Sequence, residues 1–214
     1  MSEAIETAAP ADEQAPALPQ PERLRRALQR QYARLALFPQ RPFHLHTGAA
    51  LAALLGYDAE ALGRLPQQAV ASFSGAAHLF ALGGPAPGER VLDVGSGSGV
   101  DALLAARAVG PQGRVVGIDL TAEMVGLARD AARRAKLSNL EFREGQAEEL
   151  PLADASIDVV LSNNVLNHLV IDKPRALAEL RRVLRPGGRL LLGDVVLERP
   201  VPDSGRAVLD LWTT

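Results

Sequence analysis

The sequence predicts an α/β fold in which helices cover both faces of a doubly wound, mostly parallel sheet. From residue 88 onward, short apolar stretches alternate with stretches whose apolar residues recur at helical spacing. The apolar stretches are almost unbroken, which is typical of strands that are buried on both faces. The connections between them are short, as in units where a strand, a helix and a parallel strand follow one another.

The expected elements follow a regular order along this part of the chain. Thr121 is expected to cap the second helix, because a threonine side chain can accept a hydrogen bond from the first turn. The Pro186-Gly187-Gly188 triplet is expected to end the last helix. The expected order is a strand at 90–94, a helix at 99–109, a strand at 114–120, a helix at 122–136, strands at 140–143 and 157–162, a helix at 173–184 and a strand at 189–197.

An all-helical region is expected ahead of the sheet. Its first helix, 22–38, has an apolar stripe formed by Leu24, Leu28, Tyr32 and Leu35, which we expect to pack against the rest of the protein. A shorter helix is expected over 47–55, and one or two more are expected over 66–82. Little in the first 21 residues could compensate for the entropy of ordering them. The predicted organisation is a disordered tail (1–21), a helical region (22–87) and an α/β domain (88–214).

The composition excludes several classes of protein and site. The 214 residues include no cysteine, so disulfides, thiolate metal sites and a cysteine nucleophile are excluded. The net charge is −2, and no basic stretch indicates binding to nucleic acid or to an anionic membrane. No apolar stretch is long enough for a membrane helix, and the pattern of a signal peptide is absent. We therefore expect a cytoplasmic protein with neither nucleic acid nor a membrane as its partner.

The strongest functional signal is the stretch VLDVGSGSG, residues 91–99, which follows a strand and opens a helix. Such a loop lies at the carboxyl end of the sheet, where doubly wound folds bind their ligands. Its glycines allow sharp turns and a close approach of the backbone to a ligand. Asp119 ends the next strand, 20 residues after Gly99, where a carboxylate can accept both hydroxyls of a ribose. The pattern indicates a site for a cofactor that contains a nucleoside.

Three interpretations of this loop remain open on the residues alone. A dinucleotide such as NAD(P) would require a small residue at position 100, where the chain has Val100. Asp93 would repel a pyrophosphate, but it would suit the ammonium and sulfonium groups of S-adenosylmethionine. The third interpretation is a glycine turn that binds no ligand. The acidic residue before the loop favours S-adenosylmethionine.

Four stretches together resemble the class I S-adenosylmethionine-dependent methyltransferases, whose fold is Rossmann-like: VLDVGSGSG, GIDLTAEMVGLAR, GQAEELPLADASIDVVLSNNVLNH and ELRRVLRPGGRLLLGDVV. The resemblance implies S-adenosylmethionine as the cofactor. It implies that the glycine loop surrounds the methionine part, that Asp119 holds the ribose, and that Leu120 faces Gln146 and Ala147 across the adenine. The cofactor residues that it implies are Asp93, Gly95, Ser96, Gly97, Gly99, Asp119, Leu120, Gln146, Ala147 and Asn163, the last facing the methyl group.

Within that class the chain resembles the arsenite methyltransferases and the ubiquinone-biosynthesis-like enzymes grouped with them, and this similarity includes LPQQAVASFSGAAHLFALG. Arsenite chemistry in that group depends on cysteine thiolates, and Ala76 and Asn164 stand where relatives carry cysteine. Because the chain has no thiolate, binding of arsenic by three sulfur atoms is excluded. Appended N-terminal helices often cover the substrate pocket in this class, so residues 22–87 are interpreted as a lid region.

Few residues are expected at the reaction site, because methyl transfer from a sulfonium depends on alignment more than on a general base. His168 and Asn163 are the candidate catalytic residues, with a packing role at a helix end as the alternative for His168. His44 and His46 share one face of an extended segment and, with Asn164, are candidate substrate contacts. Structural hydrogen bonding is the alternative for the two histidines, and a role in the turn is the alternative for Asn164. No third ligand accompanies them, so no metal is expected.

Three other polar residues are expected to take no direct part in the chemistry. His78 lies among alanine and leucine residues and is expected to be structural. Glu148 and Glu149 lie in a loop, so we expect both carboxylates to be exposed to solvent.

The sequence thus predicts a methyltransferase that acts on a small molecule by in-line displacement. The alternative is a relative of the arsenite methyltransferases that has lost arsenic binding and acts as a non-catalytic S-adenosylmethionine-binding or partner-dependent protein. An NAD(P) oxidoreductase is the third hypothesis. The reason to consider a non-catalytic binding protein lies in the C-terminal part of the sequence, because the resembled domain has two more strands beyond the fifth. The stretch 190–196 is apolar for an edge strand, so a homodimer or a partner is expected to cover it.

Overall fold

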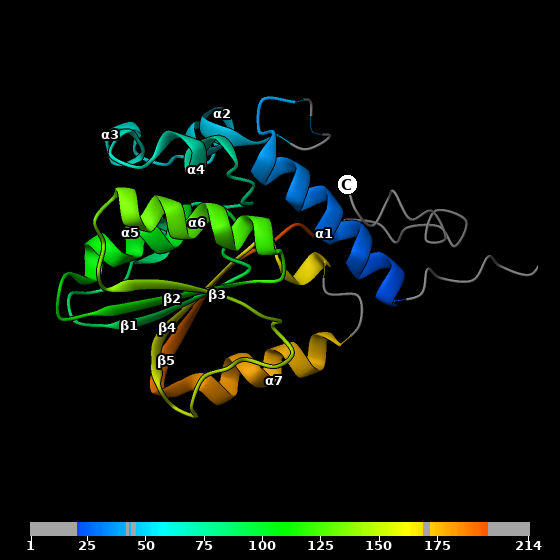
Figure 1. Ribbon diagram of the computed structural model, residues 1–214. Coiled ribbons are helices and arrows are strands. Elements are labelled where there is room, and N and C mark those ends of the chain that lie inside the picture. Colours follow the sequence, from blue (N-terminus) through cyan, green and yellow to red (C-terminus); the bar gives the residue numbers. More distant parts are fainter. Residues whose placement is uncertain (1–20, 42, 44–45, 169–171, 197–214) are drawn as a thin grey trace, which may run out of the picture.

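A five-stranded parallel sheet with the strand order β3-β2-β1-β4-β5 forms the centre of the structure (Figure 1). The structure is a computed structural model and describes residues 21–41, 43, 46–168 and 172–196. The strand order reverses between β1 and β4, and open α/β sheets bind ligands beyond the carboxyl ends of their strands at such a point. The strands are β1 (Arg90–Val94), β2 (Arg114–Asp119), β3 (Leu140–Glu144), β4 (Ile157–Asn163) and β5 (Leu184–Gly193).

Helices cover both faces of this sheet, as Figure 1 shows. These helices are α5 (Val100–Val109), α6 (Ala122–Arg134) and α7 (Lys173–Val183). Alternate residues of each strand face the two helical layers. Val91 and Val159 lie in the core with α5 and α6, whereas Leu92 and Val160 lie in the core with α7. Both faces are therefore buried, which explains the unbroken apolar stretches.

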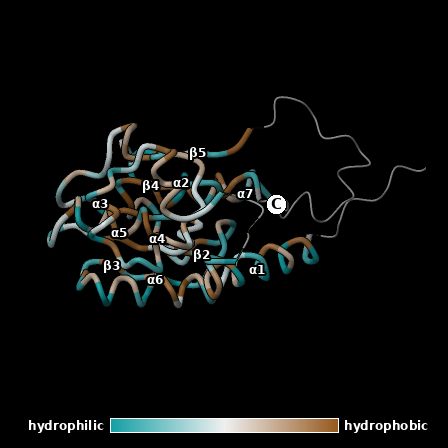
Figure 2. Tube along the Cα trace, turned by 90° about the horizontal axis from the view of Figure 1, so that it is seen from above, coloured by the Kyte–Doolittle hydropathy of each residue, from teal (hydrophilic) through white to brown (hydrophobic). Residues whose placement is uncertain are grey.

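The N-terminal helices lie on the same side of the sheet as α5 and α6 (Figure 1). They are α1 (Pro21–Leu37), α2 (Gly48–Leu54), α3 (Ala59–Gly63), α4 (Gln67–Ala71) and the 3-10 helix η1 (Leu79–Leu82). Hydrophilic and hydrophobic positions alternate along α1, as expected of an amphipathic helix (Figure 2). Leu24, Leu28 and Leu35 of its apolar stripe are buried, which confirms the packing role expected of them. Leu35 packs in one cluster with Met124 of α6.

The structure confirms the predicted fold class but differs from the expected elements at two places, the cap at Thr121 and the Pro186-Gly187-Gly188 triplet. The side chain of Thr121 makes no capping hydrogen bond, and its backbone N–H donates to Oδ1 of Asp119 (2.8 Å). The stretch 66–82, where one or two helices were expected, forms two short ones, α4 and η1. The Pro186-Gly187-Gly188 triplet lies inside β5, which begins directly after α7 and absorbs the triplet through a shift in its pairing with β4.

Some predictions concern the ends of the described chain. Residues 1–20 of the predicted tail and the predicted strand end at Leu197 lie outside the described residues, while Pro21 begins α1. No helix in the described ranges is long and apolar enough to cross a membrane. β5 is an edge strand of the described sheet, and Leu192 and Val196 near its end are exposed. The expected homodimer or partner at this edge stays a prediction.

Candidate functional site

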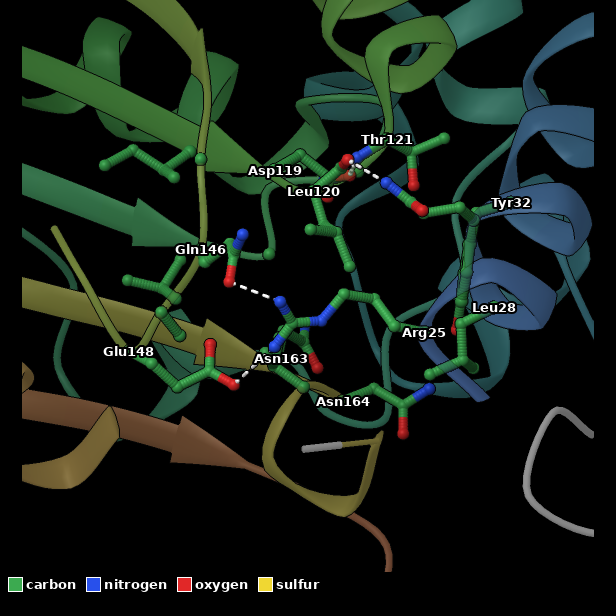
Figure 3. Close-up of a pocket in the computed structure, with 18 of the residues that line it drawn as sticks. Arg25, Leu28, Tyr32, Asp119, Leu120, Thr121, Gln146, Glu148, Asn163 and Asn164 are labelled. Carbon is green, nitrogen blue, oxygen red and sulfur yellow. Dashed lines mark hydrogen bonds and ion pairs between the residues drawn. The ribbon is translucent and has the colours of Figure 1, made fainter. Parts of the chain in front are cut away.

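A pocket lies at the carboxyl ends of β1, β2 and β4, between the sheet and α1 (Figure 3). The loops that follow β1, β2 and β3 form one side of it, and α1 forms the other. The pocket therefore stands where the reversal in strand order places a ligand site. Its wall consists of Leu24, Arg25, Leu28, Gln29, Tyr32, Ser74, Val94, Gly95, Gly97, Ile118, Asp119, Leu120, Thr121, Gly145, Gln146, Ala147, Glu148, Asn163, Asn164 and Val165.

The glycines of the loop after β1 have different reasons to lack a side chain. Gly97 lines the pocket with φ +51°, and a Cβ there would meet no atom within 4 Å, so the backbone borders open space. Gly95 also lines the pocket, and its Cβ would lie 2.4 Å from a methyl carbon of Val165. Gly99 does not line the pocket; its Cβ would lie 2.7 Å from the ring of Phe142, so this glycine permits close packing. Gly97 is thus the residue whose open backbone lets a ligand approach the loop, whereas Gly95 makes room for Val165.

Asp119 holds the glycine loop and faces the pocket at the end of β2. Its Oδ2 accepts a hydrogen bond from the backbone N–H of Gly97 (2.8 Å), and its Oδ1 accepts one from the N–H of Thr121 (2.8 Å). Burial raises the pKa of the carboxyl, while these N–H donors act in the opposite direction. Each carboxylate oxygen keeps acceptor capacity. The geometry therefore fits a ligand with two neighbouring hydroxyls, such as a ribose.

Asp93 and Ser96 are buried and do not line the pocket. Asp93 is 2% exposed, and both its Oδ2 and the hydroxyl of Ser96 are buried without a hydrogen-bond partner. Burial raises the pKa of Asp93 well above its usual range, and the charges of Asp101 and Asp119 raise it further. A positive group above the loop would relieve this repulsion, so the site fits a cationic ligand better than a pyrophosphate. Direct cofactor contacts of Asp93, Ser96 and Gly99 stay predictions, since none of the three lines the pocket.

A polar cluster at one end of the pocket joins α1 to two loops (Figure 3). Arg25 donates to Oε1 of Gln146 (2.5 Å) and forms an ion pair with Oε1 of Glu148 (3.2 Å). Gln29 donates to the backbone carbonyl of Leu120 (3.1 Å). The prediction that Glu148 is exposed to solvent was wrong, because its contact with α1 leaves the residue only 8% exposed. Leu120, Gln146 and Ala147 line the pocket together, as the adenine assignment requires.

Sequence reasoning missed the polar residues of α1. The apolar stripe of this helix was interpreted as packing, and the neighbouring Arg25 and Gln29 received no role. One signal was available: the two residues are four positions apart and therefore share one flank of the helix. Two other expectations agree with the structure. Glu149 is exposed, and His78 packs on the ring of Tyr57 with 4.4 Å between ring centroids.

The predicted catalytic and substrate residues are only partly brought together. Asn163 and Asn164, at the end of β4, line the pocket. His168 ends the short 3-10 helix η2, which begins two residues after Asn164. His46 is exposed and does not line the pocket, and His44 lies outside the described residues. The catalytic role of His168 and the substrate role of the two other histidines stay predictions.

Comparison with known proteins identifies the domain that carries this pocket. Residues 85–212 match a family described as a methyltransferase domain. The chain belongs to this family. Its similarity to arsenite methyltransferases and to the UbiE enzymes places it among the class I S-adenosylmethionine-dependent methyltransferases. S-adenosylmethionine is therefore the cofactor, as the sequence predicted. The contacts that the glycine loop and Asp119 make with it stay predictions.

Similar proteins include an arsenite methyltransferase of Halobacterium salinarum, 45% identical over 70% of this chain and 38% of its own length. The ubiquinone/menaquinone biosynthesis C-methyltransferase UbiE of Vibrio campbellii is 37% identical over 61% of this chain and 49% of its own. The crystal structure of an arsenic(III) S-adenosylmethionine methyltransferase from Chlamydomonas reinhardtii has a TM-score of 0.50 and 38% identity, covering 68% of this chain and 48% of that one. The methyltransferase chain spans less than half the length of these relatives.

Proposed function

We propose that this domain transfers the methyl group of S-adenosylmethionine to a small-molecule acceptor by in-line displacement. The observation that carries the proposal is the open backbone at Gly97 beside the carboxylate of Asp119, at the carboxyl ends of adjacent strands. When bound, S-adenosylmethionine supplies a methyl group on a positively charged sulfur. The protein's part is to align this cofactor with the acceptor, and alignment contributes about 7–11 kcal/mol in favourable cases. A general base is therefore not a requirement.

The wall outside the cofactor assignment supports an uncharged organic acceptor. Outside that assignment, the charged side chains on the described wall are Arg25 and Glu148, which form an ion pair and neutralise each other. An apolar wall with a few hydroxyl and amide groups suits a phenol or a quinol, which needs one or two hydrogen bonds and no counter-ion. Residues in this part of the wall include Leu28, Tyr32, Ser74, Asn164 and Val165.

Arsenite is a second candidate acceptor, because arsenite methyltransferases are among the similar proteins. Trivalent arsenic is a soft centre that binds thiolates. This chain has no cysteine, and residues without sulfur, Ala76 and Asn164, stand at the two positions expected to carry cysteine in such relatives. A free thiol such as glutathione would have to supply every sulfur ligand. These facts favour the organic acceptor.

The test is an acceptor panel with the purified chain and S-adenosylmethionine, scored by release of S-adenosylhomocysteine and by mass spectrometry of the product. The panel contains catechol, a reduced naphthoquinone, a metabolite extract, and arsenite with glutathione. We expect methylated product from an organic acceptor, none from arsenite, and none with the Asp119→Ala variant. Methylated arsenicals would overturn the acceptor assignment. Stabilisation by S-adenosylhomocysteine with no turnover of any acceptor would support a non-catalytic binding protein, and stabilisation by NAD(P) alone would support an oxidoreductase.

A further inference from the structure

Residues 74–77, here called the strap, connect α4 to η1 and cross the end of β4. Ser74 lines the pocket, and all four residues of the strap are half-buried. Gly75 passes so close to β4 that a Cβ on it would lie 2.6 Å from Nδ2 of Asn163. The neighbouring Asn164 donates from Nδ2 to the carbonyl of Ser74 (3.1 Å). The strap is thus a piece of the pocket wall whose position depends on two asparagines at the end of β4.

Asn163 binds the strap through both ends of its amide. Its Oδ1 accepts hydrogen bonds from the backbone N–H groups of Ala76 (2.7 Å) and Ala77 (3.1 Å). Its Nδ2 donates to the carbonyl of Ala77 (2.9 Å) and to Oδ2 of Asp101 (2.8 Å). Backbone N–H groups only donate and carbonyls only accept, so the strap fixes the orientation of this amide. Both amide hydrogens and the oxygen are engaged within the protein, which argues against the catalytic role predicted for Asn163.

Asp101 and Tyr57 complete this network from behind the pocket wall. The hydroxyl of Tyr57 lies 2.7 Å from Oδ1 of Asp101 and 3.0 Å from the carbonyl of Ala77, and it can donate to either. Tyr57 and Asp101 are each 5% exposed, and neither lines the pocket. Asp101 stands in the first turn of α5, two residues after the glycine loop ends at Gly99. The network therefore ties the strap to the helix that begins at the cofactor loop.

We propose that Tyr57, Asp101 and Asn163 form a positioning network that fixes the strap beside the reacting end of the cofactor. In this arrangement Asn163 acts on the bound cofactor through the strap and not by touching it. The inference rests on the proposed function, since it assigns the network to the same pocket. A network of buried, fully satisfied polar groups is well suited to this task, because it specifies one arrangement of the segments that it joins.

Three variants separate this role from a general loss of stability. Tyr57→Phe is the decisive one, because it removes a hydroxyl that does not line the pocket and keeps the ring. Asn163→Ala removes the contact with the strap itself. Asn139→Ala is the matched control, since Asn139 also holds backbone, donating to the carbonyls of Ala106 (2.9 Å) and Gly110 (2.8 Å), and does not line the pocket.

Two measurements need no acceptor: hydrogen exchange at the amides of Ala76 and Ala77, followed by NMR, and the dissociation rate of S-adenosylhomocysteine. Net hydrogen-bond contributions of 0.5–1.5 kcal/mol correspond to changes of roughly 2- to 13-fold. We expect Tyr57→Phe and Asn163→Ala to accelerate both processes by about that factor, and Asn139→Ala to leave both unchanged. Faster dissociation in Asn163→Ala alone would show direct contact between Asn163 and the cofactor and would overturn the proposal. Exchange and dissociation rates in Tyr57→Phe and Asn163→Ala that equal those of Asn139→Ala would also overturn it. A wild-type chain that binds no S-adenosylhomocysteine would refute the proposed function, while amide exchange would still test the network.

Discussion

Replacing Asp119 with alanine removes the carboxylate that joins the glycine loop to the ribose side of the pocket. A hydrogen bond to a charged group contributes about 1.5–3 kcal/mol. Two ribose hydroxyls at the lower value give about 3 kcal/mol, and each 1.4 kcal/mol is about a tenfold change in affinity. Asp119→Ala is therefore expected to weaken the binding of S-adenosylhomocysteine by at least about a hundredfold.

Calorimetric titration with S-adenosylhomocysteine measures this loss directly. The matched control is Glu144→Ala, because Glu144 pairs with Asp119 across β2 and β3 and is exposed. Asp119→Ala also leaves the N–H groups of Gly97 and Thr121 without their acceptor, so its thermal stability must be measured alongside. A folded Asp119→Ala variant whose affinity stays within about threefold, or less than 1 kcal/mol, of the wild type would refute the ribose assignment.

Three further predictions concern the same pocket. Because burial raises the folded-state pKa of Asp93, the folded protein holds the proton of this carboxyl more tightly than the unfolded chain does. Its stability should therefore fall as the pH rises from about 4 through the folded-state pKa. Thermal melts of Asp93→Asn should show a flatter pH dependence than those of the wild type, and a steeper one would contradict this reasoning. Gly99→Ala should lower stability by about 2 kcal/mol or more, and Gly97→Ala by about 1 kcal/mol. Gly97→Ala should weaken the binding of S-adenosylhomocysteine more than Gly99→Ala does. The opposite ranking in melts and titrations would reverse the assignment of Gly99 to packing and of Gly97 to ligand approach. Arg25→Met should weaken the binding of S-adenosylhomocysteine, because it leaves the buried Glu148 without its partner. Adding Glu148→Gln should restore part of the lost affinity. A double variant whose loss of binding free energy equals the sum of the two single losses would exclude this coupling.

Local signals were sufficient for the central part of the site. The glycine loop and Asp119 belong to one unit of strand, loop, helix and strand, in which spacing along the chain determines spacing in the structure. The same spacing could not tell which glycines face a ligand. Gly99 lies in the loop like Gly97, but the ring that comes close to it belongs to Phe142 of β3. Alternation of strands and helices likewise predicted the sheet but not the way β5 absorbs Pro186-Gly187-Gly188.

Contacts between distant segments were beyond reach of the sequence pattern. Glu148 lies in a polar loop, which by itself indicates exposure, and its burial depends on Arg25, 123 residues away. Asn163, the last residue of β4, was placed at the methyl group by the family resemblance, but its amide is occupied by a strap 86 residues away in the chain. In both cases the role of the polar side chain depends on a partner in the N-terminal region, which is Arg25 for Glu148 and the strap for Asn163.

The burial of α1 bears on how quickly the pocket can exchange its contents. Leu24 and Leu28 face the pocket and are only 1% and 8% exposed. Lifting the helix away would bring both side chains into water, at about 1.5–3 kcal/mol each or about 3–6 kcal/mol together. A state that costs this much is populated for between about one part in 10² and one part in 10⁴ of the time. We therefore expect dissociation of S-adenosylhomocysteine to require this displacement of α1, and its rate should rise with any co-solvent that weakens apolar packing.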